Sequence, residues 1–113
     1  MTKVILFKKE AHFIGLEVKG HAGYANKGSD IVCAGISTAV CMSINLLDKF
    51  IYNRFELIQD EAVGYICLKN FDYSSLTDIQ VEIVTQIFIN LLETLQDIEA
   101  NYQNHLKVKI ENK

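Results

Sequence analysis

The sequence predicts one two-layer α+β domain, a mostly antiparallel five-stranded sheet with two helices packed on one face. Segments with the two-residue period of strands alternate with two long segments of helical period, in the order β-β-α-β-β-α-β. The chain has 113 residues, the size of one domain, and half of them are hydrophobic, enough to build a core. Because we find no linker or low-complexity tract, we expect residues 1–113 to form a single domain.

The first two predicted strands lie near the N-terminus. Residues 3–8 form a short apolar run rich in β-forming residues, which is typical of a buried strand. Residues 12–19 alternate between apolar and polar side chains, which indicates a half-buried strand. We expect Phe13 on its outer face. The residues expected on its core face are Ile14, Leu16 and Val18.

After Asp30 the pattern becomes helical. Apolar residues recur at spacings of three and four, with more apolar residues beside them, so we expect a largely buried helix that ends near Asn53. Its predicted buried stripe is Ile36, Val40, Ser43, Leu47 and Phe50. Several polar residues interrupt positions 31–47, so this segment falls short of the roughly 20 apolar residues that a membrane span needs.

The second half of the chain repeats the pattern. Residues 55–59 and 63–69 predict two strands around a turn at 60–61. The S-x-x-D sequence at 75–78 resembles a capping box and predicts the start of a second helix. Alternation over 106–110 predicts a last half-buried strand. The apolar stripe of the second helix is Ile83, Ile87, Leu91, Leu95, Ile98 and Tyr102, with Val84 and Phe88 alongside.

Charge and cysteine content argue against several classes of protein. The net charge is −3, whereas a domain that neutralises phosphates usually has a basic face, so we expect no direct contact with nucleic acid. Three cysteines without a CxxC pair fit neither a disulfide framework nor a zinc ribbon, and we expect Cys41 and Cys67 in the core. The N-terminal apolar run is too short for a signal peptide. We therefore expect a cytoplasmic protein that does not contact a membrane.

Residues 20–37 concentrate the reactive side chains of the chain. If Asp30 is the helix N-cap, Cys33 falls in the first helical turn, where unpaired N–H groups and the helix dipole favour a thiolate. The same N–H groups could stabilise an oxyanion. His21 follows a strand, and the glycine-containing loop after it can fold back to place the imidazole beside the sulfur as a base or an imidazolium partner.

Each of these residues also has a simpler interpretation. A cysteine in an apolar helix is usually a core residue, and a loop histidine is often only a surface residue. Asp30 is as readily a helix cap as a catalytic acid, and a capping carboxylate cannot easily orient His21 as well. Metal binding by His21, Asp30 and Cys33 matches no familiar zinc spacing, and no Lys-Ser/Thr pair follows the glycines, as a phosphate-binding loop would require. Spacing alone thus indicates a thiol site without fixing its reaction.

The residues of this stretch add a resemblance to a known family. They read Gly20-His21-Ala22, then Ala25 and Gly28, then Asp30-Ile31-Val32-Cys33-Ala34, then Ser37. Without a gap, they resemble the signature of the Prp family, the ribosomal-processing cysteine proteases of Firmicutes and their relatives. The resemblance implies that His21 is the catalytic histidine, that Cys33 is the nucleophile and that Asp30 is the motif acid. The residues expected to bind the substrate are Gly20, Gly23, Gly28 and Ser37.

The resemblance also implies a specific reaction. Family members remove a short N-terminal extension from a large-subunit ribosomal protein, cutting after a pair of aromatic residues. They are homodimers with a mobile loop over the site, here residues 22–29, and they need no metal or cofactor. Two alternatives stay open: a non-catalytic dimer that only binds peptides, and a thiol redox sensor at Cys33.

Overall fold

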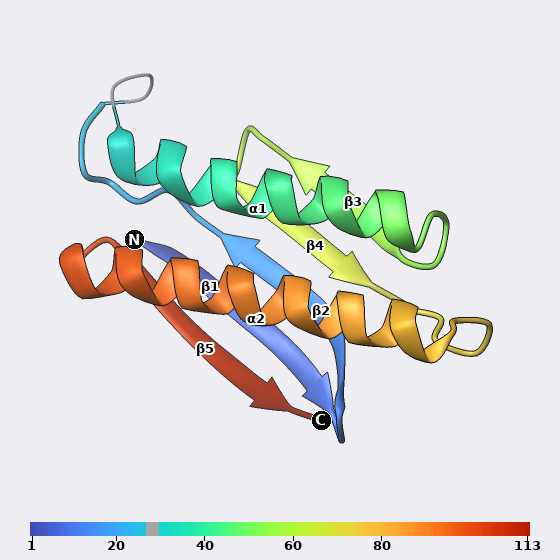
Figure 1. Cartoon of the computed structure of the whole chain (residues 1–113). Coiled ribbons are helices and arrows are strands. Elements are labelled where there is room, and N and C mark those ends of the chain that lie inside the picture. Colours follow the sequence, from blue (N-terminus) through green and yellow to red (C-terminus); the bar gives the residue numbers. More distant parts are fainter. Residues whose placement is uncertain (27–29) are drawn as a thin grey trace.

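The computed structural model describes residues 1–26 and 30–113, and over these residues the elements follow the predicted order (Figure 1). They are β1 (Thr2–Lys9), β2 (His12–Lys19), α1 (Ile31–Phe50), β3 (Glu56–Asp60), β4 (Tyr65–Lys69), α2 (Asp78–Asn101) and β5 (Leu106–Asn112). The five strands form one sheet, and both helices cover the same face of it. The predicted fold class is therefore confirmed.

The strand order in the sheet is β3-β4-β2-β1-β5. Three neighbouring pairs are antiparallel, and only β1 and β5 run parallel. After β4, the chain crosses the sheet as α2 and returns as β5 at the opposite edge (Figure 1). This crossover brings the C-terminal strand beside the first one, and it places the α2–β5 turn at the same end of the molecule as the end of β2.

The core lies between the sheet and the two helices. Most of the expected stripe residues are buried there, and α1 and α2 pack against each other. Each fully buried Leu or Phe contributes roughly 1.5–3 kcal/mol relative to an exposed one. This layer holds the first turn of α1 above the end of β2. The largest fully buried side chains include Phe88, Leu6, Leu16, Leu47, Leu91 and Leu95.

The prediction for the faces of β2 is wrong at its first residues. The pairing with β1 shifts from Phe7 opposite Gly15 to Lys8 opposite Phe13, so Ile14 is the extra residue of a β-bulge. The bulge returns Phe13 to the core face, where it is 3% exposed and stacks on Phe88 with ring centroids 4.8 Å apart.

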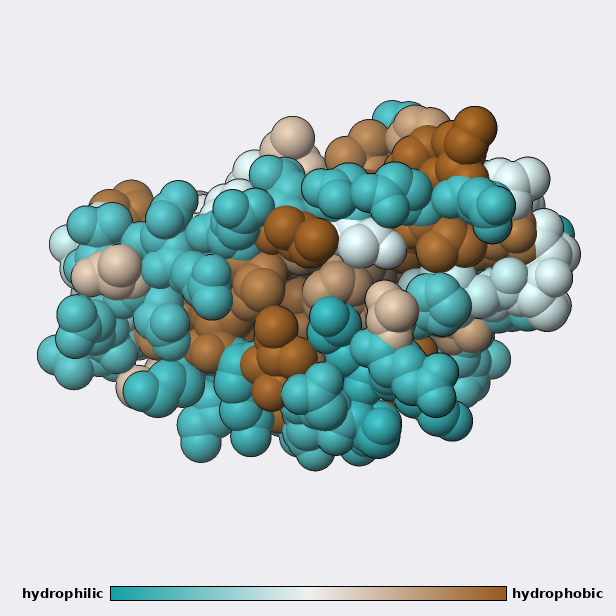
Figure 2. All heavy atoms as spheres, turned by 60° about the horizontal axis from the view of Figure 1, so that its bottom comes forward, coloured by the Kyte–Doolittle hydropathy of each residue, from teal (hydrophilic) through white to brown (hydrophobic). Residues whose placement is uncertain are grey.

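The helix α1 is less buried than predicted. It ends at Phe50, which is 43% exposed, and Ile51 takes the buried place beyond it. By length and composition alone, α1 could cross a membrane, but one of its faces packs into the core of this fold. Figure 2, which views the lower side of Figure 1, shows hydrophobic atoms reaching the surface between polar ones. The buried residues of α1 are Val32, Ile36, Val40, Ser43 and Leu47, and the exposed apolar ones include Ile31, Met42 and Leu46.

Two further details differ from the sequence-based expectation. The helix α2 begins at Asp78 with Thr77 as N-cap, and the capping box joins Thr77 to Gln80. Cys41 is exposed and Cys67 is half-buried, so neither belongs to the core. Both differences arise because several positions satisfy the same local pattern, and only the packing selects among them.

Candidate active site

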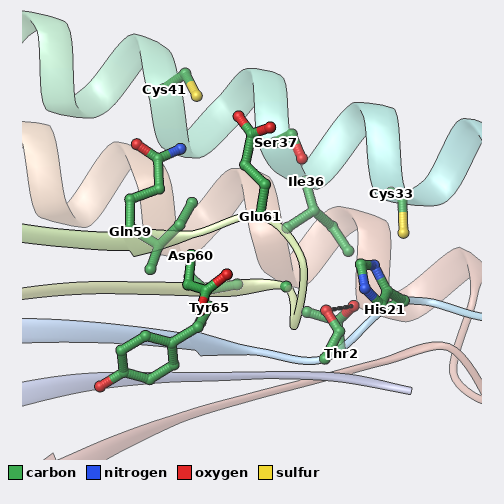
Figure 3. Close-up of a pocket in the computed structure, with 14 residues that line it drawn as sticks. Thr2, His21, Cys33, Ile36, Ser37, Cys41, Gln59, Asp60, Glu61 and Tyr65 are labelled. Carbon is green, nitrogen blue, oxygen red and sulfur yellow. Dashed lines mark hydrogen bonds between the residues drawn. The ribbon is translucent and has the colours of Figure 1, made fainter.

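The end of β2 carries His21 toward α1. Gly20 has φ +88° and donates its N–H to the carbonyl of Gly64, at 2.8 Å. A Cβ at Gly20 would lie 2.7 Å from the carbonyl oxygen of Met1, so only glycine fits this close approach. As a result, the exposed imidazole of His21 and the sulfur of Cys33 are directed toward one another at one end of a cavity (Figure 3).

Cys33 lies in the first turn of α1, as predicted. The carboxylate of Asp30 caps this helix: its Oδ1 accepts the N–H groups of Val32 and Cys33, both at 3.0 Å. The N–H of Ala22, the neighbour of His21, donates to Sγ of Cys33 at 3.1 Å. The loop after β2 therefore does fold back onto the helix start.

Asp30 joins this loop to α1. Its Oδ2 accepts the N–H groups of Tyr24 and Ala25, at 2.9 and 3.3 Å. The Cys33 N–H makes the largest contribution to holding the pKa of Asp30 below its ordinary value of 3.8; burial acts in the opposite direction, and the other three N–H groups lower the pKa further. With both oxygens engaged by backbone N–H groups, the carboxylate is a helix cap and a loop anchor. A catalytic role for Asp30 stays a prediction.

The helix-start N–H groups are not free to hold an oxyanion, as the sequence had led us to expect. Those of Val32 and Cys33 donate to the Asp30 carboxylate, and that of Ala34 donates to the Asp30 carbonyl at 3.1 Å. This expectation is wrong because capping and oxyanion binding compete for the same donors. The hydroxyl of Ser37, one helical turn beyond Cys33, is a polar group on the same side of α1.

Two hollows meet at the cysteine. The first, of about 240 Å³, lies between α1 and the β3–β4 hairpin, and the second, of about 330 Å³, lies toward the loop after β2. His21, Cys33 and Ser37 line both of them. Gly20 lines the first and Gly23 the second. A bound molecule could therefore extend from the sulfur into both hollows.

The structure thus brings together most of the predicted site residues. His21, Cys33 and Ser37 share a cavity wall, and Asp30 supports them from the helix start. Gly28 lies outside the described residues. Within residues 1–26 and 30–113, no group of three or more His, Cys, Asp or Glu side chains is arranged to hold a metal ion.

His105 is a supporting residue that the sequence did not reveal. Its Nδ1 lies 3.0 Å from the carbonyl oxygen of Ala22 and donates to it, because a carbonyl can only accept. The ring of Tyr24 packs edge-on against the rings of Tyr102 and His105, each at 5.3 Å between centroids. The α2–β5 turn therefore holds the loop that contacts Cys33. No local pattern could show this, since Ala22 and His105 are 83 positions apart.

Replacing Asp30 with asparagine should lower the melting temperature by several degrees at neutral pH, because one amide oxygen cannot replace two carboxylate oxygens as acceptors. The folded-state pKa of Asp30 is depressed, so its stabilisation is present above the ordinary value of 3.8 and is lost as the pH falls through the lower folded value. The difference from wild type should therefore stay constant down to about pH 5 and shrink in acid.

Thermal unfolding followed by circular dichroism at several pH values measures this difference. The matched control is Asp97→Asn, which removes the same charge from an exposed position on α2. A difference between Asp30→Asn and wild type that is as large in acid as at neutral pH would contradict the assignment of Asp30 as the charged cap.

Comparisons with known proteins show what the chain is similar to. The family model described as cysteine protease Prp matches residues 1–107. The ribosomal processing cysteine protease Prp of Bacillus subtilis is 30% identical over 98 residues, which cover 84% of this chain and 83% of that protein. The protein of the same name from Staphylococcus aureus is 25% identical over 108 residues, 96% of each chain.

Solved structures share the fold. The S. aureus essential ribosomal processing protease Prp, in complex with a covalently linked product peptide, has a TM-score of 0.84 at 24% identity, covering 98% of this chain and 100% of that one. A Streptococcus mutans protein has a TM-score of 0.80 at 26% identity, covering 100% and 96%. The arrangement of one mixed sheet and two helices is thus common to all three.

Proposed function

The chain belongs to the cysteine protease Prp family, and from that premise we propose that it is a ribosomal processing endopeptidase in which Cys33 is the nucleophile and His21 the base. One observation carries the proposal: the thiol and the imidazole line the same two hollows, and the backbone N–H of Ala22 donates to the sulfur. Both side chains are accessible, since His21 is exposed and Cys33 is half-buried.

The proposed substrate is the N-terminal extension of a large-subunit ribosomal protein, cut after a pair of aromatic residues. Relatives bear the name ribosomal processing cysteine protease, and one S. aureus structure holds a substrate peptide. The first hollow offers apolar walls from Val18, Ile36 and Ile66 beside Cys33, which suit an aromatic side chain.

In the proposed mechanism, His21 takes the proton of Cys33, and the sulfur attacks the carbonyl carbon of the second aromatic residue. The tetrahedral intermediate collapses to a thioester as His21 protonates the leaving amine. Water, deprotonated by His21, then hydrolyses the thioester and restores the thiol. Because Asp30 occupies the helix-start N–H groups, the hydroxyl of Ser37 is the proposed donor to the oxyanion.

The remaining expected properties are also proposals. Gly23 would let the peptide backbone approach closely, since it has φ +70° and a Cβ there would meet nothing within 4 Å, whereas Gly20 would contact the substrate from the wall of the first hollow. We propose that the protein acts in the cytoplasm as a homodimer, without a metal, cofactor, nucleic acid or membrane. The exposed apolar residues on α1, such as Met42 and Leu46, offer surface that a second copy would cover.

Incubation with a synthetic peptide that carries one Phe-Phe pair tests the function. Mass spectrometry should show two products from a single cut after the second aromatic residue, and a matched peptide with Ala-Ala in place of the pair should stay intact. An uncut Phe-Phe peptide would contradict the proposed activity. Tight binding without cleavage would instead support the peptide-binding module, and reversible oxidation of Cys33 without cleavage would support the redox sensor.

A further inference from the structure

The turn between β3 and β4 is built to hold one conformation. The carboxylate of Asp60 accepts the N–H of Ala62 at 3.0 Å, and the N–H of Gly64 donates to the carbonyl of Glu61 at 3.3 Å. Gly64 has φ +64°, in the left-handed region that glycine adopts at little cost. The conformation of the turn is therefore fixed by hydrogen bonds within the turn itself.

This turn contacts the end of β2. The carbonyl of Gly64 accepts the N–H of Gly20 at 2.8 Å. On the other side, the hydroxyl of Thr2 donates to the Gly20 carbonyl at 3.4 Å, and the carbonyl oxygen of Met1 lies 2.7 Å from the position that a Gly20 Cβ would take. Gly20, the residue that precedes His21, is therefore held from two sides, through its N–H and through its carbonyl.

Gly64 also lies against the imidazole itself. A Cβ on Gly64 would be 3.0 Å from Cε1 of His21 and 2.8 Å from the carbonyl oxygen of Gly20. Real side chains do not tolerate the shorter distance, so the turn, the end of β2 or the imidazole would have to move. Gly64 and His21 line the same hollow, on the side of the ring that the β3–β4 hairpin occupies.

We propose that Gly64 is a positioning residue for His21: its missing side chain lets the β3–β4 turn contact the imidazole and hold it toward Cys33. The proposal rests on the role of His21 in the proposed function. A catalytic group displaced by about 1 Å can lose roughly 100-fold in rate. A side chain at position 64 should therefore lower turnover more than it weakens substrate binding.

Two substitutions separate the side chain from the backbone conformation. Gly64→Ala adds a Cβ and also strains the left-handed backbone, whereas Gly64→Asn adds the same Cβ at a conformation that asparagine tolerates. Both variants should lower kcat by about 10- to 100-fold with KM within about threefold. The matched control is Val63→Ala in the same turn, an exposed residue whose truncation should leave kcat unchanged.

A spectroscopic measurement tests the position of the ring without activity. The chain has only three histidines, so the Cε1–H signals of a histidine-labelled sample can be assigned by single substitutions. In both Gly64 variants the His21 signal should move, while that of His12 should not.

Wild-type kcat and an unmoved His21 signal in Gly64→Asn would overturn the proposal. Loss of activity in Gly64→Ala alone would also overturn it, because backbone strain would then explain the effect. If the wild-type protein does not cut the Phe-Phe peptide, the proposed function fails, but a shifted His21 signal would still support the contact.

Discussion

Replacing Cys33 with alanine should reduce cleavage of the aromatic-pair peptide by at least about 10⁴-fold, to an undetectable level. The sulfur forms the bond to the substrate carbonyl in the proposed mechanism, and the other thiol that lines this hollow, Cys41, lies about two helical turns farther along α1. Alanine leaves the hollows open, so the peptide should bind with an affinity within a few-fold of wild type. Product masses measure the first quantity, and fluorescence anisotropy of a labelled peptide measures the second.

The matched control for this variant is Cys41→Ala, since Cys41 is an exposed cysteine on the same helix. It should keep wild-type turnover, and this result would show that loss of a thiol from α1 is not enough to abolish cleavage. Full turnover in Cys33→Ala would contradict the assignment of Cys33 as the nucleophile. Loss of peptide binding together with cleavage would show that Cys33 supports the shape of the site rather than the bond-forming step.

The second large effect is expected for His21→Ala, which should lower cleavage by about 10³-fold or more and slow the alkylation of Cys33 by iodoacetamide at neutral pH. Without the imidazole, no base faces the thiol from the end of β2, although the N–H of Ala22 still donates to it. Because the two residues act as a unit, the double variant Cys33→Ala/His21→Ala should be no worse than Cys33→Ala alone.

Alkylation of the single variants measures this prediction, with His12→Ala as the control. His12 lies at the far end of β2 and stacks on Tyr73, with centroids 4.6 Å apart, so its loss should change neither cleavage nor alkylation. If His21→Ala keeps the wild-type alkylation rate and the wild-type turnover, another group must take the proton of Cys33.

Local sequence patterns determine the element order because they depend on neighbours within a turn or a strand. Asp30 caps α1 as predicted, since an N-cap is selected by the three residues that follow it. Phe13 was assigned to the wrong face because alternation assumes a regular strand, and the bulge at Ile14 depends on the pairing with β1. The parallel pairing of β5 with β1 has no local signal at all.

The same limit applies to the site. Residues close in sequence, such as Cys33 and its cap, could be placed from spacing, whereas the nearness of His21 needed the family resemblance as well. The contacts of Gly64 with His21 and of His105 with Ala22 join distant parts of the chain and were not predicted. The competition for the helix-start N–H groups, by contrast, was visible in the sequence, because one carboxylate at Asp30 was expected to use the same donors.

The contacts between the α2–β5 turn and the loop after β2 have a consequence during biosynthesis. His21 and Cys33 are synthesised well before His105, whose side chain holds Ala22. The parallel pairing of β1 with β5 likewise forms only after β5 has been synthesised. A nascent chain that ends before β5 therefore carries both reactive side chains without the support that aligns them. The supported arrangement of His21 and Cys33 is thus reached only after β5 has been synthesised.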